Sequence, residues 1–381
     1  KNQVDSEVLL SYAGDEGYVR VEEPEDADVV VVNTCGFIES AKEESINTFF
    51  ALKERCPKAK IIMAGCLAQR YGKDMELEEA DAIFGNHDLS FFPEVLRNLD
   101  KNEKTVSIPE YPDPDRERDE RKDLLSFPRS AYLKISEGCN HCCSYCAIPV
   151  IRGPLRSRPF DKVVSEAKRL IKEGIYEINV IAQDLGAYGL ALYGKSRFTE
   201  LMKTLSALDG DFVLRMLYIH PDTFPMDLID LVAENKKILP YFDIPVQHAD
   251  RDVLKAMRRS GDGEKYGELF RKIREKNPDA VIRTTLMLGF PGEDRAAFEK
   301  LLDFVKTSQP DWMGSFTYSR EEDTPAYSMR NQKDHDKAQR TAKKWQKELE
   351  EAQSPITEKR LEKIVGNTYR ALIEEKIEGE D

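Results

Sequence analysis

The chain has 381 residues, which is enough for two or three domains that each bury a core. No apolar run approaches the roughly 18 residues of a membrane span, and its seven cysteines are too few for a disulfide scaffold, so we expect a cytoplasmic protein with reduced thiols and no membrane segment. With 57 Lys and Arg against 70 Asp and Glu, the net charge of −13 disfavours nucleic acid as a substrate and favours a basic partner.

The N-terminal part alternates strand-like and helix-like patterns. Apolar runs at 27–33, 60–65 and 80–85 predict strands, and helical spacing at 39–54 predicts a helix. The apolar runs are continuous, which is typical of parallel strands covered on both faces. We therefore expect a small parallel-sheet α/β domain over residues 1–101.

Residues 102–130 differ from the segments on either side. They combine four prolines with many charges and show little apolar periodicity. This composition predicts an interdomain linker, and its run of charges at 115–122 should be solvated surface.

Strand patterns then recur six times, with helical patterns between them, over residues 131–332. The clearest helical pattern lies at 160–171 and should stop at Gly174. A strand followed by a helix, repeated six times, predicts a partial (βα)6 barrel of parallel strands with its helices outside. The predicted strands are 132–136, 177–182, 212–219, 241–246, 280–288 and 312–319.

The C-terminal part is expected to be simpler. Residues 333–365 predict a long charged helix, and residues 366–381 begin like a strand and then run out. One strand cannot form an independent fold, so any further domain would be cut short here.

Four of the cysteines lie in SEGCNHCCSYC at 136–146, directly after the first predicted barrel strand, where such barrels collect their chemistry. Cys139, Cys143 and Cys146 have the spacing C-x3-C-x2-C, whereas Cys142 adjoins Cys143 and should point elsewhere. Three thiolates suit a four-iron, four-sulfur cluster with one iron left open. The alternative is structural zinc with His141 as a strained fourth ligand, which would make the protein a non-catalytic, zinc-stabilised adaptor.

Two more thiols, Cys35 and Cys66, each follow an apolar strand of the N-terminal domain and precede a helix. They should share the carboxyl edge of the sheet, where open α/β sheets bind ligands. Two thiols are too few for a cluster of their own. Cys56 lies at a helix end and is expected to be a bystander.

The cysteine spacing within the sixfold βα repeat resembles the radical S-adenosylmethionine enzymes, and the whole chain resembles their methylthiotransferase branch. Several stretches are similar to the ribosomal-protein aspartate methylthiotransferases (RimO family) rather than to the transfer-RNA enzymes (MiaB family). These stretches are SEGCNHCCSYCAIPVIRGPLRSR, VIAQDLGAYG, RMLYIHPD, YFDIPVQHAD and FTYSREEDTPAY.

The resemblance implies two four-iron, four-sulfur clusters. The radical-generating cluster would be held by Cys139, Cys143 and Cys146. The second would be held by three N-terminal cysteines, of which Cys35 and Cys66 match two and the third would precede Lys1. The stretch 366–381 would correspond to the start of a small C-terminal β-barrel, the TRAM domain.

The resemblance also implies a reaction that uses S-adenosylmethionine twice. One molecule donates a methyl group to sulfur held at the second cluster. Another yields the radical that takes a hydrogen from an aspartate β-carbon, after which the carbon–sulfur bond forms. The implied substrate is the twelfth protein of the small ribosomal subunit, with a reducing electron donor as the other partner. The alternative is methylthiolation of adenosine in transfer RNA.

Further polar groups and glycines lie at or near predicted strands. Candidate contacts for S-adenosylmethionine are Tyr145, Gln183, Arg283, Gly289 and Gly292, and candidates for holding the substrate carboxylate are Arg215 and His220. For each of them the alternative is a structural role, such as a packed aromatic ring, a turn or a satisfied polar pair.

Overall fold

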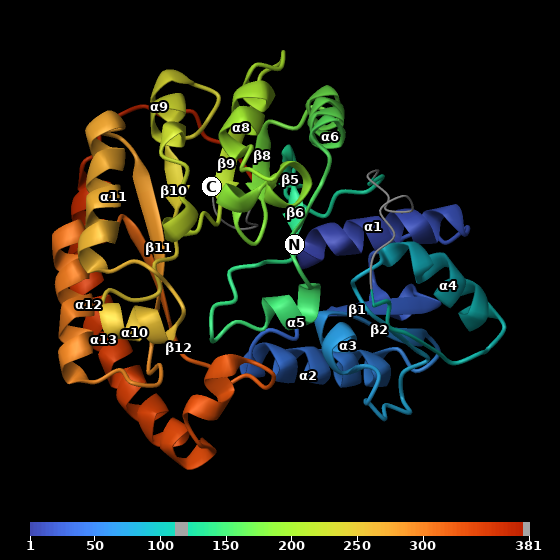
Figure 1. Cartoon of the computed structure of the whole chain (residues 1–381). Helices are drawn as coiled ribbons and strands as arrows, with labels where there is room; N and C mark the ends of the chain where they lie inside the picture. The colour runs from blue at the N-terminus through green and yellow to red at the C-terminus, as the bar shows by residue number, and fades with distance from the viewer. Residues whose placement is uncertain (111–120, 376–381) are drawn as a thin grey trace.

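The computed structural model describes residues 1–110 and 121–375, and it has two lobes that lie against each other (Figure 1). The smaller lobe, coloured blue to teal in Figure 1, is N-terminal, and the larger lobe runs from green to red. No helix in the described residues is both long and apolar enough to cross a membrane.

The smaller lobe is built on a parallel sheet with strands in the order β1-β2-β3-β4. On one face, Leu9 of α1 and Phe92 of α4 pack with Ile62 of β2, and on the other, Phe49 of α2 packs with Met63 of β2. The expected parallel sheet covered on both faces is confirmed. Its elements are α1 Asn2–Asp15, β1 Val29–Thr34, α2 Glu39–Arg55, β2 Lys60–Gly65, α3 Cys66–Tyr71, β3 Ala82–Phe84, α4 Phe92–Asp100 and β4 Thr105–Ser107.

The larger lobe contains six parallel strands in two three-stranded sheets, β5-β8-β9 and β10-β11-β12. A parallel bridge between Leu214 and Ile238 and a hydrogen bond from Ile219 N to Asp243 O (2.9 Å) connect β9 to the region of β10, so the six strands follow one another as a partial barrel. The strands are β5 Ser130–Lys134, β8 Glu177–Ile181, β9 Val213–Leu217, β10 Tyr241–Asp243, β11 Val281–Leu288 and β12 Trp312–Thr317.

Helices follow these strands and cover the outside of the partial barrel (Figure 1). The long helices are α6 Phe160–Lys172, α8 Phe198–Ser206, α9 Asp227–Glu234, α11 Gly263–Lys276, α12 Arg295–Ser308 and α13 Gln332–Glu362. The short elements are β6 Ser136–Glu137, α5 Ile148–Arg152, β7 Arg156–Ser157, α7 Leu190–Tyr193, α10 Arg251–Ala256 and the 3-10 turns Pro24–Asp26, Leu89–Phe91, Leu185–Ala187, Pro221–Thr223 and Pro325–Met329.

Helix α6 shows how the local sequence sets an element boundary. Val163, Ala167 and Leu170 recur at helical spacing and are fully buried against the barrel strands. The helix ends at Lys172, and Gly174 follows with a φ of 86°. Glycine takes this left-handed conformation at little cost, so the stop predicted at Gly174 is explained by the C-terminal turn.

Three features differ from the sequence-based expectations. Strand β4 lies within the segment expected to be a linker, and the antiparallel pair of β6 and β7 was not expected. Residues 366–375 lie in no helix or strand, and residues 376–381 lie outside the described part, so the start of a TRAM barrel is not confirmed. A single extended segment has no neighbouring strand to satisfy its backbone groups.

Buried ion pairs join the lobes. Arg121 is 2% exposed and pairs with Glu7 of α1 and with Glu166 of α6. The expected solvation of the run 115–122 is therefore wrong at Arg121, and residues 115–120 lie outside the described residues. On another side of the joint, Glu321 accepts hydrogen bonds from Arg70 of α3 (2.9 Å) and pairs with Lys42 of α2 (3.2 Å).

Candidate active site at the joint of the lobes

The loop with the cysteine spacing lies between β6 and α5, at the carboxyl end of the first barrel strand. It begins at Gly138, which has a φ of 72° and whose added Cβ would lie 2.1 Å from the carbonyl oxygen of Pro154, so only glycine fits. Cys142 is exposed with a φ of 53°, whereas its neighbour Cys143 is buried. This left-handed turn separates the two adjacent side chains, which supports the prediction that Cys142 is not a ligand without testing it.

The other three thiols of this loop share one environment. Burial, with a smaller contribution from the charge that Cys143 would carry, raises the pKa of Cys139 to about 11 and that of Cys146 to about 12. All three are free of disulfides. Without a metal, Cys139 and Cys146 are therefore protonated at neutral pH, and a metal would have to displace those protons to bind.

Three soft thiol donors on one short loop fit an iron–sulfur cluster by their chemistry. In the described part of the chain, no three His, Cys, Asp or Glu side chains already stand in a metal-binding geometry. The ligand set Cys139, Cys143 and Cys146 accordingly stays a prediction, supported by the donor type and by the exposed position of Cys142.

A histidine of this loop, His141, stacks on His220 from the loop after β9. His141 and His220 stack with centroids 4.0 Å apart, and Asp184 Oδ2 lies 2.6 Å from His141 Nε2. Asp222 N donates to His220 Nδ1 (3.2 Å), so the His220 proton sits on Nε2, which faces Cys143 Sγ at 4.0 Å. Burial, with the charges of Arg259 and His141, holds the pKa of His220 far below its ordinary value.

This arrangement bears on the roles predicted for His220 and His141. Neutral, buried His220 faces a cysteine of the loop, which favours a role at the thiols over a grip on a substrate carboxylate. His141 is held by Asp184 through Nε2, which leaves only its Nδ1 free to bind a metal in the zinc alternative. Asp184 is not among the residues predicted from the sequence, although a charged residue just beyond a buried strand is a signal that could have found it.

The predicted cofactor contacts fall into different classes. Gln183 donates to Glu137 Oε1 (2.7 Å), and its own Oε1 is buried without a hydrogen-bond partner, so it has an unused acceptor for a ligand. Tyr145 packs edge-on against Phe290, with centroids 6.4 Å apart, and burial raises its pKa well above the ordinary value. Gln183 thus remains a good candidate, and Tyr145 has a packing role that leaves cofactor contact as a prediction.

The two glycines have structural explanations. Gly289 has a φ of 76°, and an added Cβ would lie 2.7 Å from the Cβ of Ala342 on α13. Gly292 has a φ of 93° and open space around it. Turn geometry and the close passage of α13 account for both, so neither conformation points to the cofactor.

Both predicted arginines are engaged in ion pairs. Arg283 Nη1 donates to Asp243 Oδ1 (3.0 Å). Arg215 Nε donates to Glu177 Oε1 (2.7 Å), and Glu177 begins β8. Arg215 therefore reaches toward the amino ends of the strands, away from the cysteine loop at their carboxyl ends, which disfavours its expected role at the substrate.

The second pair of thiols lies on the smaller lobe, as expected from their strands. Cys35 follows β1, and Cys66 begins α3 directly after β2. A Cβ added to Gly36 would lie 2.9 Å from the backbone of Cys66, so the two segments touch. Burial raises the pKa of Cys35, and the potential charge of Cys66 adds to it. Cys56 is buried at the end of α2 and is bystander in position as expected.

Cys66 is surrounded by polar side chains. Its sulfur accepts hydrogen bonds from Arg152 Nη2 (3.2 Å) and Asn86 Nδ2 (3.3 Å), and its thiol donates to Asn2 Oδ1 (3.4 Å). Arg152 is the last residue of α5, the helix that begins two residues after Cys146. One short helix therefore connects the two cysteine sites.

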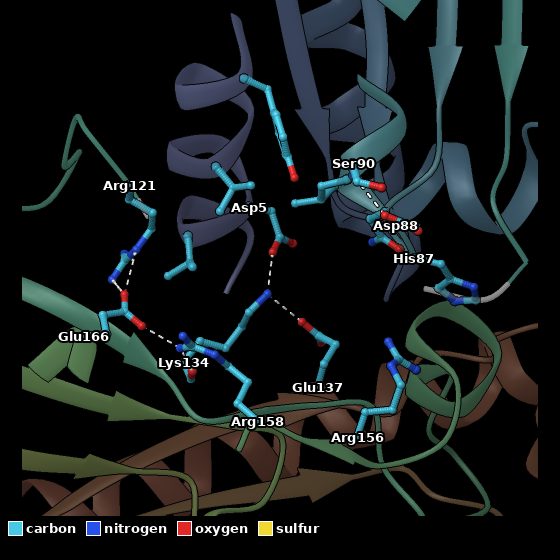
Figure 2. Close-up of a pocket in the computed structure, with 15 residues that line it drawn as sticks. Asp5, His87, Asp88, Ser90, Arg121, Lys134, Glu137, Arg156, Arg158 and Glu166 are labelled. Carbon is cyan, nitrogen blue, oxygen red and sulfur yellow. Dashed lines mark hydrogen bonds and ion pairs between the residues drawn. The ribbon is translucent and has the colours of Figure 1, made fainter. Parts of the chain in front are cut away.

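A network of buried charges surrounds that connection. Lys134 lies between Asp5 (2.8 Å) and Glu137 (2.9 Å), and Arg152 donates to the other oxygen of Asp5 (2.6 Å). Figure 2 shows Lys134, Asp5 and Glu137 together at a pocket between the lobes. These pairs hold α1 of the smaller lobe against the first strand of the barrel and keep the two cysteine sites facing the same joint.

Comparisons with known proteins agree with this architecture. The family model described as the radical SAM superfamily matches residues 133–305, and that of the uncharacterized protein family UPF0004 matches residues 1–85. A ribosomal protein uS12 methylthiotransferase RimO from Treponema denticola is 42% identical, over 100% of this chain and 86% of its own. A protein of the same name from Aquifex aeolicus is 43% identical, over 98% of this chain and 82% of its own.

Solved structures show the same fold at low sequence identity. The radical S-adenosylmethionine methyltransferase TsrM from Kitasatospora setae, with cobalamin and a [4Fe-4S] cluster bound, matches with a TM-score of 0.61 and 14% identity. The match covers 84% of this chain and 70% of that one. At this identity the likeness supports the fold alone.

Proposed function

Because this chain belongs to the RimO family of radical S-adenosylmethionine methylthiotransferases, we propose that it adds a methylthio group to the β-carbon of an aspartate in ribosomal protein uS12. The observation that carries the proposal is the pair of cysteine sites, one on each lobe, connected by α5. A methylthiotransferase must both generate a radical and deliver sulfur, and two neighbouring thiol sites suit these two tasks.

In the proposed mechanism, Cys139, Cys143 and Cys146 hold the first cluster and Cys35 and Cys66 supply two ligands of the second. The first cluster would bind S-adenosylmethionine at its open iron and supply the electron that cleaves the sulfonium. Gln183 would accept a hydrogen bond from the cofactor, because its buried Oε1 has no other partner. The donors around Cys66 keep its sulfur oriented toward the joint.

The substrate follows from charge as well as from the family. The chain carries 70 acidic against 57 basic side chains, and such a surface attracts a basic protein and repels the phosphates of transfer RNA at long range. A protruding loop of a basic ribosomal protein is the form of substrate that could enter the joint between the lobes.

The test uses the enzyme expressed at the full length of its relatives and reconstituted anaerobically with iron and sulfide. It is incubated with S-adenosylmethionine and a low-potential reductant, separately with uS12 and with transfer RNA. Mass spectrometry should find a methylthio group in place of one hydrogen on a uS12 aspartate. Modification of transfer RNA alone would overturn the proposal, and a colourless protein that binds zinc in place of iron would overturn the enzyme class itself.

A further inference from the structure

Arg259 is a buried cation without an acidic partner. It lies in the connection between α10 and α11 and is 7% exposed. Its Nη1 donates to the carbonyl oxygens of Pro245 (2.7 Å) and Val246 (2.9 Å), while its Nε is buried with no hydrogen-bond partner. Within residues 1–110 and 121–375, no carboxylate forms an ion pair with it. The nearby carboxylate of Asp222 accepts from Tyr266 Oη (2.8 Å) and Ser260 N (2.8 Å) and forms no ion pair with Arg259. A buried charge that is neither directly paired nor fully hydrogen-bonded is unfavourable, so a further anion close to the guanidinium would be stabilised here.

The groups around Arg259 identify where that anion would form. Tyr145, Cys143 and Tyr266 are the ionisable side chains that act on the guanidinium and, against the opposing effect of burial, hold its pKa above the ordinary value. Burial itself raises the pKa of Tyr145 and of Tyr266, so both phenols are neutral at physiological pH. Cys143 is then the one member of this group that becomes an anion when it binds a metal, because a coordinated thiol loses its proton.

The backbone fixes this juxtaposition. Ser144 N donates to Met257 O (3.1 Å), and Ser144 Oγ donates to Ala256 O (2.7 Å), so the end of α10 is tied to the cysteine loop one residue after Cys143. Arg259 follows two residues after Met257, so these bonds hold the segment that carries Arg259 against the cysteine loop. Cys143 is among the groups of that loop that act on its guanidinium.

We propose that Arg259 is a positioning residue for the first cluster, whose fixed positive charge neutralises the Cys143 thiolate and makes the cluster easier to reduce. The proposal deepens the proposed function and rests on ligation by Cys143. The step concerned is the transfer of one electron from a low-potential reductant to the oxidised cluster, in which no bond forms or breaks. That electron adds negative charge, and a nearby cation in a water-poor environment stabilises the reduced form more than the oxidised form.

The test compares Arg259→Met, which removes the charge and keeps much of the stem, with Arg259→Lys, which keeps the charge. Arg258→Met is the matched control, because Arg258 is the adjacent residue and is exposed. Each variant is made in the full-length, reconstituted enzyme and brought to the same iron and sulfide content per chain. The readout is the midpoint potential of the first cluster, followed by electron paramagnetic resonance without S-adenosylmethionine.

At a fixed potential, we expect Arg259→Met to lower the ratio of reduced to oxidised cluster about tenfold, a shift of about 59 mV to more negative values for one electron. Arg259→Lys should keep most of the wild-type potential, and Arg258→Met should not change it. If Arg259→Met holds too little iron to be measured, retention of the wild-type potential by Arg259→Lys together with a shift in Arg259→Gln supports the same conclusion.

An unchanged potential in Arg259→Met with its cluster intact would overturn the proposal. So would an unchanged potential together with weaker binding of S-adenosylmethionine, because Arg259 would then hold the cofactor carboxylate. A separate result would overturn the proposed function: a wild-type enzyme without any cluster signal, or with a signal that Cys143→Ala does not remove.

Discussion

Cys142 and Cys143 are neighbours in the chain but occupy opposite environments. The left-handed backbone at Cys142 leaves its side chain in solvent, while Cys143 is 8% exposed and lies near His220 and Arg259. An iron–sulfur cluster needs thiolates that converge on one point and are shielded from oxygen and water. Only one of two adjacent side chains can meet that requirement in this loop.

Replacing these two cysteines should therefore have very different effects. We expect Cys142→Ala to retain the iron content of the reconstituted enzyme within error, and Cys143→Ala to lose most of the iron at the first site. Iron and sulfide analysis with absorbance near the charge-transfer bands measures both. If Cys142→Ala lost the cluster and Cys143→Ala kept it, the ligand assignment would be wrong.

The sequence indicates which thiols could be ligands, but it does not indicate which side chains surround them. Spacing predicts Cys139, Cys143 and Cys146 as ligands, because ligands on one loop are close in sequence as well as in space. Arg259 and Asp184 come from loops far along the chain, and nothing in their local sequence shows which loop they face. The sequence makes His220 a candidate, but its orientation toward Cys143 depends on the packing of three loops, which no local pattern contains.

At the scale of elements, the buried strands were predictable because their continuous apolar runs have one explanation, a sheet covered on both faces. The parallel sheet of the smaller lobe and the six strands of the larger lobe follow from those runs. Strand β4 and the pair β6 and β7 have only two or three residues each, too few to show a period. They form because neighbouring strands offer free backbone groups, which is a property of the assembled sheet.

Helix α10 gives an element-scale prediction about stability. Asp250 caps its N-terminus by accepting hydrogen bonds from the backbone of Asp252 (2.9 Å) and Val253 (3.0 Å), and it also accepts from Lys300 (2.6 Å). Burial opposes its charge, but the bond from Lys300 and the cap bonds outweigh it and hold its pKa below the ordinary value. We expect Asp250→Ala to lower the free energy of unfolding by about 1–2 kcal/mol at pH 7.

The pH dependence of that loss has a definite sign. Because the folded pKa of Asp250 lies below its unfolded value of about 3.9, its contribution is fully present above roughly pH 5 and disappears as the pH falls through the folded pKa. Urea titrations at pH 7 and at about pH 3.5 should therefore show a smaller difference between wild type and Asp250→Ala at the lower pH. Asp252→Ala, exposed on the same helix, is the control and should change stability by no more than about 0.5 kcal/mol. A larger difference at low pH would contradict the assignment of the cap.

At the scale of the whole molecule, the joint between the lobes depends on Arg121. Its guanidinium pairs with Glu7 and Glu166 and donates to Tyr132 O (2.6 Å), so one side chain touches α1, α6 and the first barrel strand. Figure 2 shows Arg121 and Glu166 paired at the side of the pocket between the lobes. Arg121→Met would leave the buried carboxylate of Glu7 without its counter-charge, which costs about 3–5 kcal/mol, whereas Glu166 would keep its pair with Arg158 (2.5 Å).

Thermal and urea unfolding of Arg121→Met should show this loss as an earlier transition or as separate unfolding of the two lobes. Arg97→Met is the matched control, because Arg97 pairs with Glu16 at the surface, where such pairs contribute about 0–1 kcal/mol. Equal effects of the two substitutions would mean that the buried pairs at the joint do not hold the lobes together.

The charge of the whole molecule makes a prediction about the encounter with its substrate, which rests on the proposed function. With a net charge of −13, the enzyme should attract basic uS12 over distances of several ångströms, and salt should screen this attraction, since the Debye length is about 10 Å at 0.1 M and about 3 Å at 1 M. The association rate constant, measured by stopped-flow fluorescence, should fall roughly tenfold or more between low and high salt, whereas the dissociation rate should change less. Transfer RNA is the opposite case: the enzyme repels it at long range, so salt should not lower its association rate constant as it does for uS12. If the association rate constant with uS12 did not depend on salt, the face that binds uS12 would not be acidic. The reason is that net charge is a sum over the whole surface, whereas only the charges near the joint act on the incoming loop.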